Sequence, residues 1–299
     1  MRAALTFAFA LLLAGCAGEE PYALRDTRVE AFASKDRVHD LRLMISLPRN
    51  YETRTAERFP AIYLLDADYS FALARNELRH FTDRKQLKEA IVVGIGYPGA
   101  EDDVDLYHRT RVRDYTPTFA KGSGYGPGQD ELSGHATEFL AVLENEVLPR
   151  IDRQFRTDPS ARMLVGHSYG GLFATWTMLT RPGLFRDYVI VSPSYWYDDK
   201  MIFRAADRYA AGHTDLAAHV FYGVGSLESA GAMARDVQDF DARMQAAKFP
   251  NYRSTVQVFD GETHNSIFPA ALSRGLRTIY DFAGEEEVKP QEAPPSTSR

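Results

Sequence analysis

The sequence MLVGHSYGGLFATW, residues 163–176, indicates the fold of this chain more strongly than any other stretch. An apolar run leads to Ser168, and a helix-like run follows it. The motif G-x-S-x-G between a buried strand and a helix is typical of a nucleophilic serine held on a strained turn. Gly166 and Gly170 fit that turn, because side chains there would collide with the neighbouring strand and helix. The alternative is a serine that only fills a tight turn, and the rest of the chain has to decide between the two.

Apolar runs recur along the chain with helical patterns between them. Residues 26–34 and 39–48 alternate or run apolar as early antiparallel strands do. Later runs are typical of strands buried on both faces and lie at 59–68, 89–98, 161–168, 187–194, 218–226 and 254–261. We expect helices at 71–88, 133–155, 170–180, 232–247 and 266–282. This order predicts an α/β fold of the α/β-hydrolase type, with a mostly parallel central sheet, helices on both faces and antiparallel strands at the N-terminal edge.

A serine nucleophile needs a general base within hydrogen-bond reach, and in this fold the order along the chain is serine, acid, histidine. His213 and His219 stand at the amino ends of strands, on the wrong side of the sheet. His264 directly follows the last apolar run and is the predicted base, with a purely structural loop histidine as the alternative. The other histidines precede Ser168 or adjoin it on the turn, namely His39, His80, His108, His135 and His167.

The acid of a catalytic triad would accept the Nδ1 proton of the histidine and hold its tautomer. Glu228 follows the apolar run at 218–226, the one before the last, and it is the predicted acid. Four other carboxylates remain alternatives, since exposed acids near such loops are common: Asp198, Asp199, Asp260 and Glu262.

The tetrahedral intermediate of acyl transfer needs two hydrogen-bond donors for its oxyanion. The backbone amide of Tyr169, directly after the nucleophile, is the first. The second is expected from the loop after the early buried strand, where the amide of Asp68 or Tyr69 is placed to donate. Asp66 and Asp68 could instead cap the helix that follows, and both roles can coexist.

With these residues in view, the chain resembles the putative-esterase family of the α/β hydrolases, which includes esterase D and the bacterial siderophore trilactone esterases. The resemblance covers most of residues 38–282. The segments that carry it are YLLDAD (63–68), RVRDYTP (111–117), GHSYGGL (166–172), SPSYW (192–196) and THNSIFPAAL (263–272). Together these motifs are specific for the family and much less so for the substrate.

The siderophore enzymes of that family imply a pocket for a large catecholate ester, with arginine and aromatic side chains at its mouth. By position Arg111, Trp196 and Tyr197 would serve here, and His167 adjoins the nucleophile as a further substrate-binding candidate. Residues 108–115 form a local basic cluster in an acidic protein, which favours an anionic substrate. The alternative is a solvated loop with ordinary surface charges. Thr110 stands where those enzymes often have a second arginine.

Composition and termini bound the remaining possibilities. The chain has 299 residues, a formal charge of −6 and a single cysteine, which fits one large domain at 22–283 and argues against a nucleic-acid partner.

Residues 1–16 look like a secretory signal that ends in LAGC, which resembles a lipobox with Cys16 as the lipidated residue. The alternative is an ordinary signal peptide. We expect export and an anchor in the outer membrane, facing the periplasm or the cell surface, and a disordered tail at 284–299.

The leading hypothesis is a serine carboxylic-ester hydrolase of the cell envelope that acts on a small-molecule ester, with siderophore-like and other bulky or anionic esters as candidate substrates. It requires no cofactor and no metal, and the sequence has no clustered metal-ligand pattern. Two alternatives are a tethered protein that only binds a ligand such as a siderophore, and an acyltransferase that uses the same nucleophile. The oligomeric state is left open.

Overall fold

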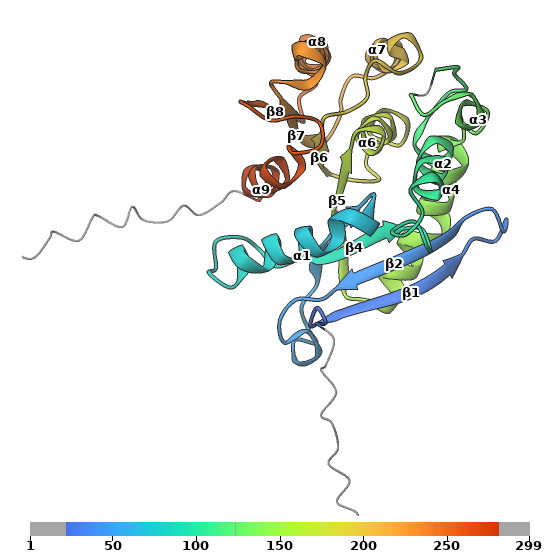
Figure 1. Ribbon diagram of the computed structural model, residues 1–299. Helices are drawn as coiled ribbons and strands as arrows, with labels where there is room; N and C mark the ends of the chain where they lie inside the picture. The colour runs from blue at the N-terminus through green and yellow to red at the C-terminus, as the bar shows by residue number, and fades with distance from the viewer. Residues whose placement is uncertain (1–21, 123, 281–299) are drawn as a thin grey trace, which may run out of the picture.

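The computed structural model describes residues 22–122 and 124–280, and within them the strands form one eight-stranded sheet (Figure 1). β1 pairs antiparallel with β2, and β2 pairs antiparallel with β4, whereas all the other pairs are parallel. In spatial order the strands are β1 (Thr27–Ala33), β2 (Asp40–Ser46), β4 (Ile91–Gly96), β3 (Phe59–Leu64), β5 (Thr157–His167), β6 (Asp187–Val191), β7 (Ala218–Gly225) and β8 (Tyr252–Phe259). The predicted fold class is confirmed.

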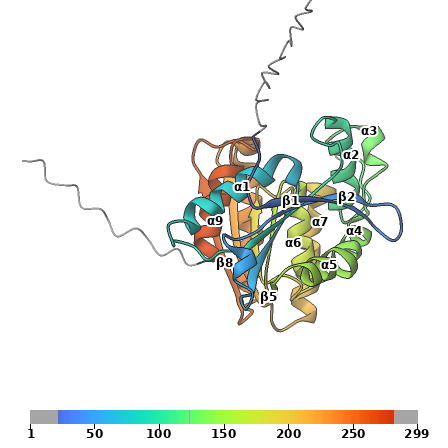
Figure 2. The same cartoon turned by 90° about the horizontal axis from the view of Figure 1, so that it is seen from below.

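Helices cover both faces of the sheet (Figure 2). On one face α1 (Ala67–Thr82) and α9 (Phe268–Ile279) bury an apolar cluster against the sheet. The other face carries the second and larger core, under α2 (Val104–Tyr115), α4 (Ala136–Val142), α5 (Leu148–Gln154), α6 (Tyr169–Thr180), α7 (Tyr197–Gly212) and α8 (Ala232–Ala246). The continuous apolar runs of the inner strands follow from this arrangement, since neither face of those strands meets water.

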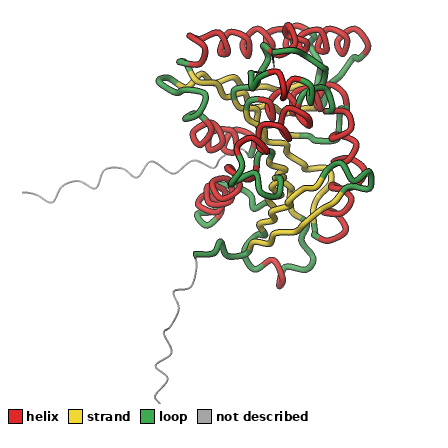
Figure 3. The backbone as a smooth tube through the Cα atoms, turned by 45° about the vertical axis from the view of Figure 1, so that its right-hand side comes forward, coloured by secondary structure: helices red, strands yellow, loops and turns green. Residues whose placement is uncertain are grey.

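Several local features differ from the expectation or refine it. The helix expected at 133–155 consists of α4, a π-helical turn η2 (Leu143–Val147) and α5. Short elements complete the description, namely α3 (Pro127–Asp130) and the 3₁₀ turns η1 (Tyr51–Thr53) and η3 (Glu228–Gly231). α2 and α7 were not expected, and both are labelled in Figure 1. Figure 3 shows the helices in red and the strands in yellow. The interpretation of residues 108–115 as a solvated loop is therefore wrong.

The predicted terminal segments lie outside the described residues, and these include the signal at 1–16 with Cys16 and the tail at 284–299. Among the helices of residues 22–280 that the structure describes, none combines the length and the apolar composition needed to cross a bilayer.

Candidate active site

Ser168 stands on a sharp turn between β5, which ends at His167, and α6, which begins at Tyr169. Its backbone has φ 59° and ψ −117°, a conformation that costs free energy for a residue with a side chain and is concentrated at functional sites. A Cβ added to Gly166 would lie 2.2 Å from the carbonyl oxygen of Gly170, so only glycine fits at that position. The turn directs Ser168 beyond the carboxyl end of a central parallel strand, where ligands bind in such sheets.

His264 and Glu228 meet on two neighbouring loops at the same end of the sheet. Nδ1 of His264 lies 2.7 Å from Oε2 of Glu228, whose side chain is fully buried. The other carboxylate oxygen, Oε1, accepts a hydrogen bond from Ser192 Oγ at 2.5 Å and one from the Gly225 amide at 2.6 Å. Burial alone would raise the pKa of Glu228, but the hydrogen bonds from His264, Ser192 and Gly225 outweigh it and lower the pKa below its ordinary value. The carboxylate is therefore held ionised.

The other carboxylates that could have served as the acid point to different partners. Asp260 accepts from Ser226 Oγ at 3.3 Å, and Asp198 accepts from Thr118 Oγ1 at 2.7 Å. Glu262 accepts from Ser266, and Asp199 lies 4.0 Å from Arg204. Within the described residues, Glu228 is the carboxylate that His264 contacts.

The turn that carries Ser168 lies beside the histidine loop. The ring centroids of His264 and His167, the residue that precedes the serine, are 4.6 Å apart. Oγ of Ser168 lies 3.3 Å from Oγ of Ser194, and the Ser194 amide donates to the Ser168 carbonyl at 3.1 Å. Hydrogen bonds between a catalytic serine and its base often form fully only when substrate is bound.

Two loops bring candidate oxyanion donors to the serine turn. Tyr169 and Asp68 each lie in the first turn of a helix, α6 and α1, where backbone amides have no acceptor within the helix. The amide of Tyr69 already donates to the Asp66 carbonyl at 3.2 Å, which leaves Asp68 as the better candidate of the two. The Asp68 side chain anchors the loop, because it accepts from the Tyr97 amide at 3.0 Å. Asp66 occupies the N-cap position of α1 without a side-chain capping bond.

Arg111 forms a buried ion pair instead of an open anion site. Its side chain is 3% exposed, and it donates to both carboxylate oxygens of Asp66, at 2.7 and 3.2 Å. It also donates to the hydroxyl of Tyr125 at 3.0 Å and to the carbonyl oxygen of His167 at 3.3 Å. Burial alone would lower the pKa of Arg111, but the charge of Asp66 beside it raises that pKa above its ordinary value. The expectation of a cation at the pocket mouth is wrong, because the charge is neutralised inside the protein.

The two aromatic residues expected at the pocket mouth, Trp196 and Tyr197, differ in their exposure to solvent. Tyr197 is 1% exposed, and its hydroxyl donates to the Thr118 carbonyl at 2.7 Å, so it supports the structure from within. Trp196 is 41% exposed, and its ring centroid lies 6.0 Å from that of Tyr169. Of the two, only Trp196 presents a surface that a substrate could touch.

His167 is a neutral imidazole beside Ser168. Burial lowers its pKa to about 3, and the nearby His264 and Arg111 act in the same direction. Its Nε2 is buried without a hydrogen-bond partner in the described structure.

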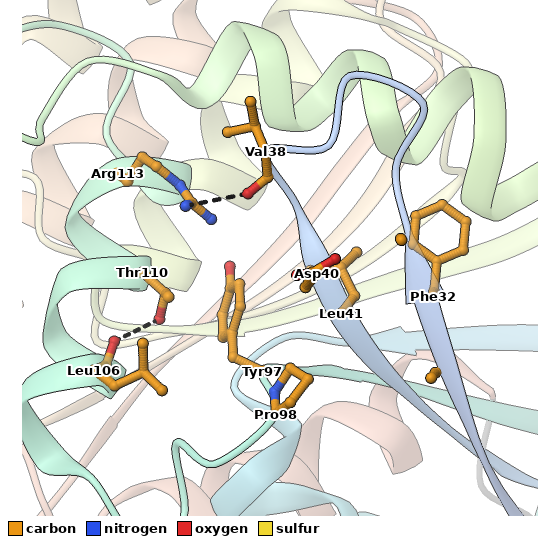
Figure 4. Close-up of a pocket in the computed structure, with 11 residues that line it drawn as sticks. Phe32, Val38, Asp40, Leu41, Tyr97, Pro98, Leu106, Thr110 and Arg113 are labelled. Carbon is orange, nitrogen blue, oxygen red and sulfur yellow. Dashed lines mark hydrogen bonds between the residues drawn. The ribbon is translucent and has the colours of Figure 1, made fainter.

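Two cavities lie near these elements. One, of about 490 Å³, is bounded by the loop after β3 and the start of α9, and it adjoins the serine turn. The other, of about 560 Å³, lies between α2 and the β1–β2 hairpin (Figure 4). In that second cavity Arg113 donates to the Val38 carbonyl at 3.4 Å and to Asp114, and Thr110 donates to the Leu106 carbonyl. His167 and Asn265, the chain neighbours of Ser168 and His264, line the first cavity and not the second, so we place the site at the first cavity.

Among the described residues, no three histidine, cysteine, aspartate or glutamate side chains come together as a metal site would require. The sequence analysis did not assign Ser192 and Ser194 a role, although both belong to the SPSYW segment that carried the family resemblance. Their position in that segment was the available signal, but the bonds that they form depend on how β6 and β7 lie side by side.

Comparison with known proteins assigns the chain to a family. Residues 34–279 match the family described as "Putative esterase". The chain belongs to this esterase family. The predicted resemblance is therefore confirmed.

Three proteins illustrate the similarity. The ferri-bacillibactin esterase BesA of Bacillus subtilis (strain 168) is 27% identical over 266 residues, which are 86% of this chain and 90% of BesA. The siderophore triacetylfusarinine C esterase of Aspergillus fumigatus is 28% identical over 284 residues, 84% of this chain and 92% of that protein. The crystal structure of the BES protein from Bacillus cereus aligns with a TM-score of 0.74 at 25% identity, over 87% of this chain and 97% of that one.

Proposed function

We propose that this member of the esterase family is a serine carboxylic-ester hydrolase with the triad Ser168, His264 and Glu228. The observation that carries the proposal is the 2.7 Å contact between His264 Nδ1 and the buried carboxylate of Glu228, on loops beside the strained turn of Ser168. The order of the three residues along the chain is that of α/β hydrolases.

The chemistry follows from this arrangement. Ser168 Oγ attacks the ester carbonyl carbon while His264 Nε2 takes the hydroxyl proton, and Glu228 stabilises the imidazolium through Nδ1. The amides of Tyr169 and Asp68 donate to the carbonyl oxygen as it gains charge. Collapse of the tetrahedral intermediate breaks the bond to the alcohol, which leaves with the proton from His264. Water then attacks the acyl-enzyme with His264 as base, and this releases the acid and restores Ser168.

Ser192 has a measurable part in this scheme, since it is one of two donors to Glu228 Oε1. In Ser192→Ala we expect kcat to fall about tenfold with little change in KM, because a hydrogen bond to a charged group contributes about 1.5–3 kcal/mol. Loss of a donor to the ionised form raises the pKa of Glu228, so the acid limb of kcat against pH moves to higher pH. Ser160→Ala, which removes an exposed hydrogen bond to Asp158 in the first half of β5, is the control. An unshifted acid limb in Ser192→Ala would contradict this role.

For the substrate, we propose a bulky ester of the siderophore type. The support comes from two relatives that span most of the chain and are named as a ferri-bacillibactin esterase and a triacetylfusarinine C esterase. An anionic preference finds no support in the basic cluster at 108–115, because Arg111 is paired with Asp66 and Arg113 with Asp114.

The test of the proposed function is labelling of the purified full-length protein by a fluorescent serine-directed phosphonate, together with turnover of a simple ester. Labelling and turnover that disappear together in Ser168→Ala are the expected result. A folded wild-type protein that takes up no label would favour ligand binding without catalysis. Ester formation with an added alcohol at the expense of acid would identify an acyltransferase.

We further propose that the enzyme is exported and anchored through a lipid on Cys16 in the cell envelope, most simply in the outer membrane facing the periplasm or the cell surface. The lipobox-like sequence LAGC at residues 13–16 supports this. In a bacterial host supplied with an alkyne-tagged fatty acid, we expect the wild-type protein to carry the tag and to sediment with membranes. Cys16→Ala should lose both properties. An untagged wild-type protein would show that the cysteine is incidental.

A further inference from the structure

The cavity of about 490 Å³ beside the serine turn has a lining that restricts what it can bind. It lies between the loop after β3 and the loop that carries His264, and His167 and Asn265, the chain neighbours of Ser168 and His264, both line it. An ester held at Ser168 therefore has one of its two arms, the acyl group or the alcohol group, within reach of this cavity. Its lining also includes Asp66, Tyr69, Leu73, Tyr107 and Phe268.

Apolar and aromatic side chains dominate this lining. The rings of Tyr69 and Tyr107 meet edge to face with centroids 4.8 Å apart, and Phe268 packs edge to face on His167 at 5.8 Å. Tyr69 is 55% exposed and Leu73 is 36% exposed, so part of the apolar surface faces solvent until something covers it. Flat rings prefer such offset and edge-on contacts.

The cavity also offers no positively charged side chain to an anionic arm of a substrate. None of its lining residues, all within the described ranges, is a lysine or an arginine. Its one carboxylate, Asp66, is bound through both oxygens by Arg111. The ring of His167, which also lines the cavity, has a pKa of about 3 and is neutral at physiological pH. A carboxylate or catecholate placed here would lose water without gaining a cation.

We infer that this cavity, which we call the arm pocket, binds an uncharged aromatic arm of the ester substrate against the rings of Tyr69, Tyr107 and Phe268. The inference rests on the proposed function, because it takes Ser168 as the point of attack. It narrows the substrate class from bulky esters in general to those with at least one neutral aromatic arm.

The test compares matched esters with the full-length enzyme, with acid release followed in a pH-stat. The neutral probes are benzyl acetate and methyl hydrocinnamate, which place the ring on the alcohol or the acyl side. Their para-carboxy analogues place a negative charge on the same ring, and methyl acetate reports the chemistry without an arm. We expect kcat/KM for at least one neutral probe to exceed that of its carboxylated analogue by at least about tenfold.

Leu73 allows the charge of the arm pocket to be changed at its edge. Leu73→Lys should reduce the discrimination about three- to fivefold, the size of an exposed charge interaction, and Leu73→Glu should increase it. The two variants act in opposite directions, so the test survives the failure of either one to fold. Val258→Lys is the matched control, because Val258 is 38% exposed on β8 and does not line the pocket. It should leave the ratio unchanged.

The outcomes separate the inference from the proposed function. Equal or better turnover of the carboxylated esters by wild-type enzyme would overturn the arm pocket, while turnover of methyl acetate and phosphonate labelling would still support the serine esterase. A preference for neutral rings that neither Leu73 variant alters would also overturn it, because the preference would then arise elsewhere. Absence of both methyl acetate turnover and labelling would overturn the proposed function, and the arm pocket with it.

Discussion

Replacing Ser168 by alanine is expected to lower kcat by at least about a thousandfold while the protein stays folded. The reason is chemical, since alanine has no oxygen to form the acyl-enzyme and the remaining groups can only assist direct attack by water. A thousandfold loss corresponds to about 4 kcal/mol of transition-state stabilisation. Hydrolysis of a simple ester, measured beside circular dichroism of both proteins, checks the prediction. The strained backbone at φ 59° is easier for a small residue to adopt than for a large one, so we expect alanine to be accepted.

His264→Ala should show a loss of similar size, because serine and histidine act as a unit and either deletion removes the same covalent pathway. The double variant should therefore be little worse than either single variant. His213→Ala is the matched control, since His213 stacks on Tyr209 at 4.0 Å, away from the sheet's carboxyl end. Near-normal turnover in Ser168→Ala or in His264→Ala would contradict the assigned triad.

The fold could be predicted from the sequence because its central strands are apolar on both faces. The strands before and after Ser168 appear as continuous apolar runs, and their alternation with helices specifies a parallel sheet. The chain order of serine, acid and histidine then places Glu228 and His264 on adjacent loops, where the structure has them in contact.

α2 could not be predicted in the same way, because its buried face is largely polar. Thr110, Arg111 and Asp114 are all buried. Arg111 pairs with Asp66, and Asp114 accepts a hydrogen bond from the Tyr97 hydroxyl at 2.7 Å, so both charged residues have partners outside the helix. A search for apolar periodicity does not detect such a face. α7 is a different case, since the spacing of its buried residues, among them Met201, Ile202, Ala206 and Tyr209, is helical and was open to prediction.

Contacts between loops are the part of the site that could least be predicted from the sequence. Ser192 Oγ reaches Glu228 only because β6 and β7 are neighbours and η3 turns the carboxylate inward. Arg111 reaches Asp66 across 45 positions of the chain, so its local charge cluster suggested an anion site where the structure has a closed pair. Side-chain pairing of this kind depends on the tertiary structure and has no local pattern.

Breaking the buried ion pair of Arg111 and Asp66 is the second change for which we expect a large effect, here on stability. Arg111→Met should lower the free energy of unfolding by about 3–5 kcal/mol, because it leaves the Asp66 carboxylate buried without its cation. Asp66 is only 6% exposed and Arg111 is 3% exposed, so water cannot replace the lost partner. Urea unfolding at neutral pH measures the difference. Arg109→Met on the same helix is the control, because its pair with Asp105 is exposed and contributes at most about 1 kcal/mol.

The double variant Asp66→Asn with Arg111→Met distinguishes a stranded charge from a simple loss of packing. If the penalty comes from the uncompensated carboxylate, removal of that charge should recover most of the stability lost in Arg111→Met. Asparagine also tolerates the left-handed backbone of position 66, with φ 54°. Activity should recover less than stability, because Arg111 also donates to the carbonyl of His167 at 3.3 Å, one residue before Ser168. A double variant as unstable as Arg111→Met would show that the guanidinium contributes through its packing and its bonds to Tyr125 and His167, and that the charge of Asp66 matters little.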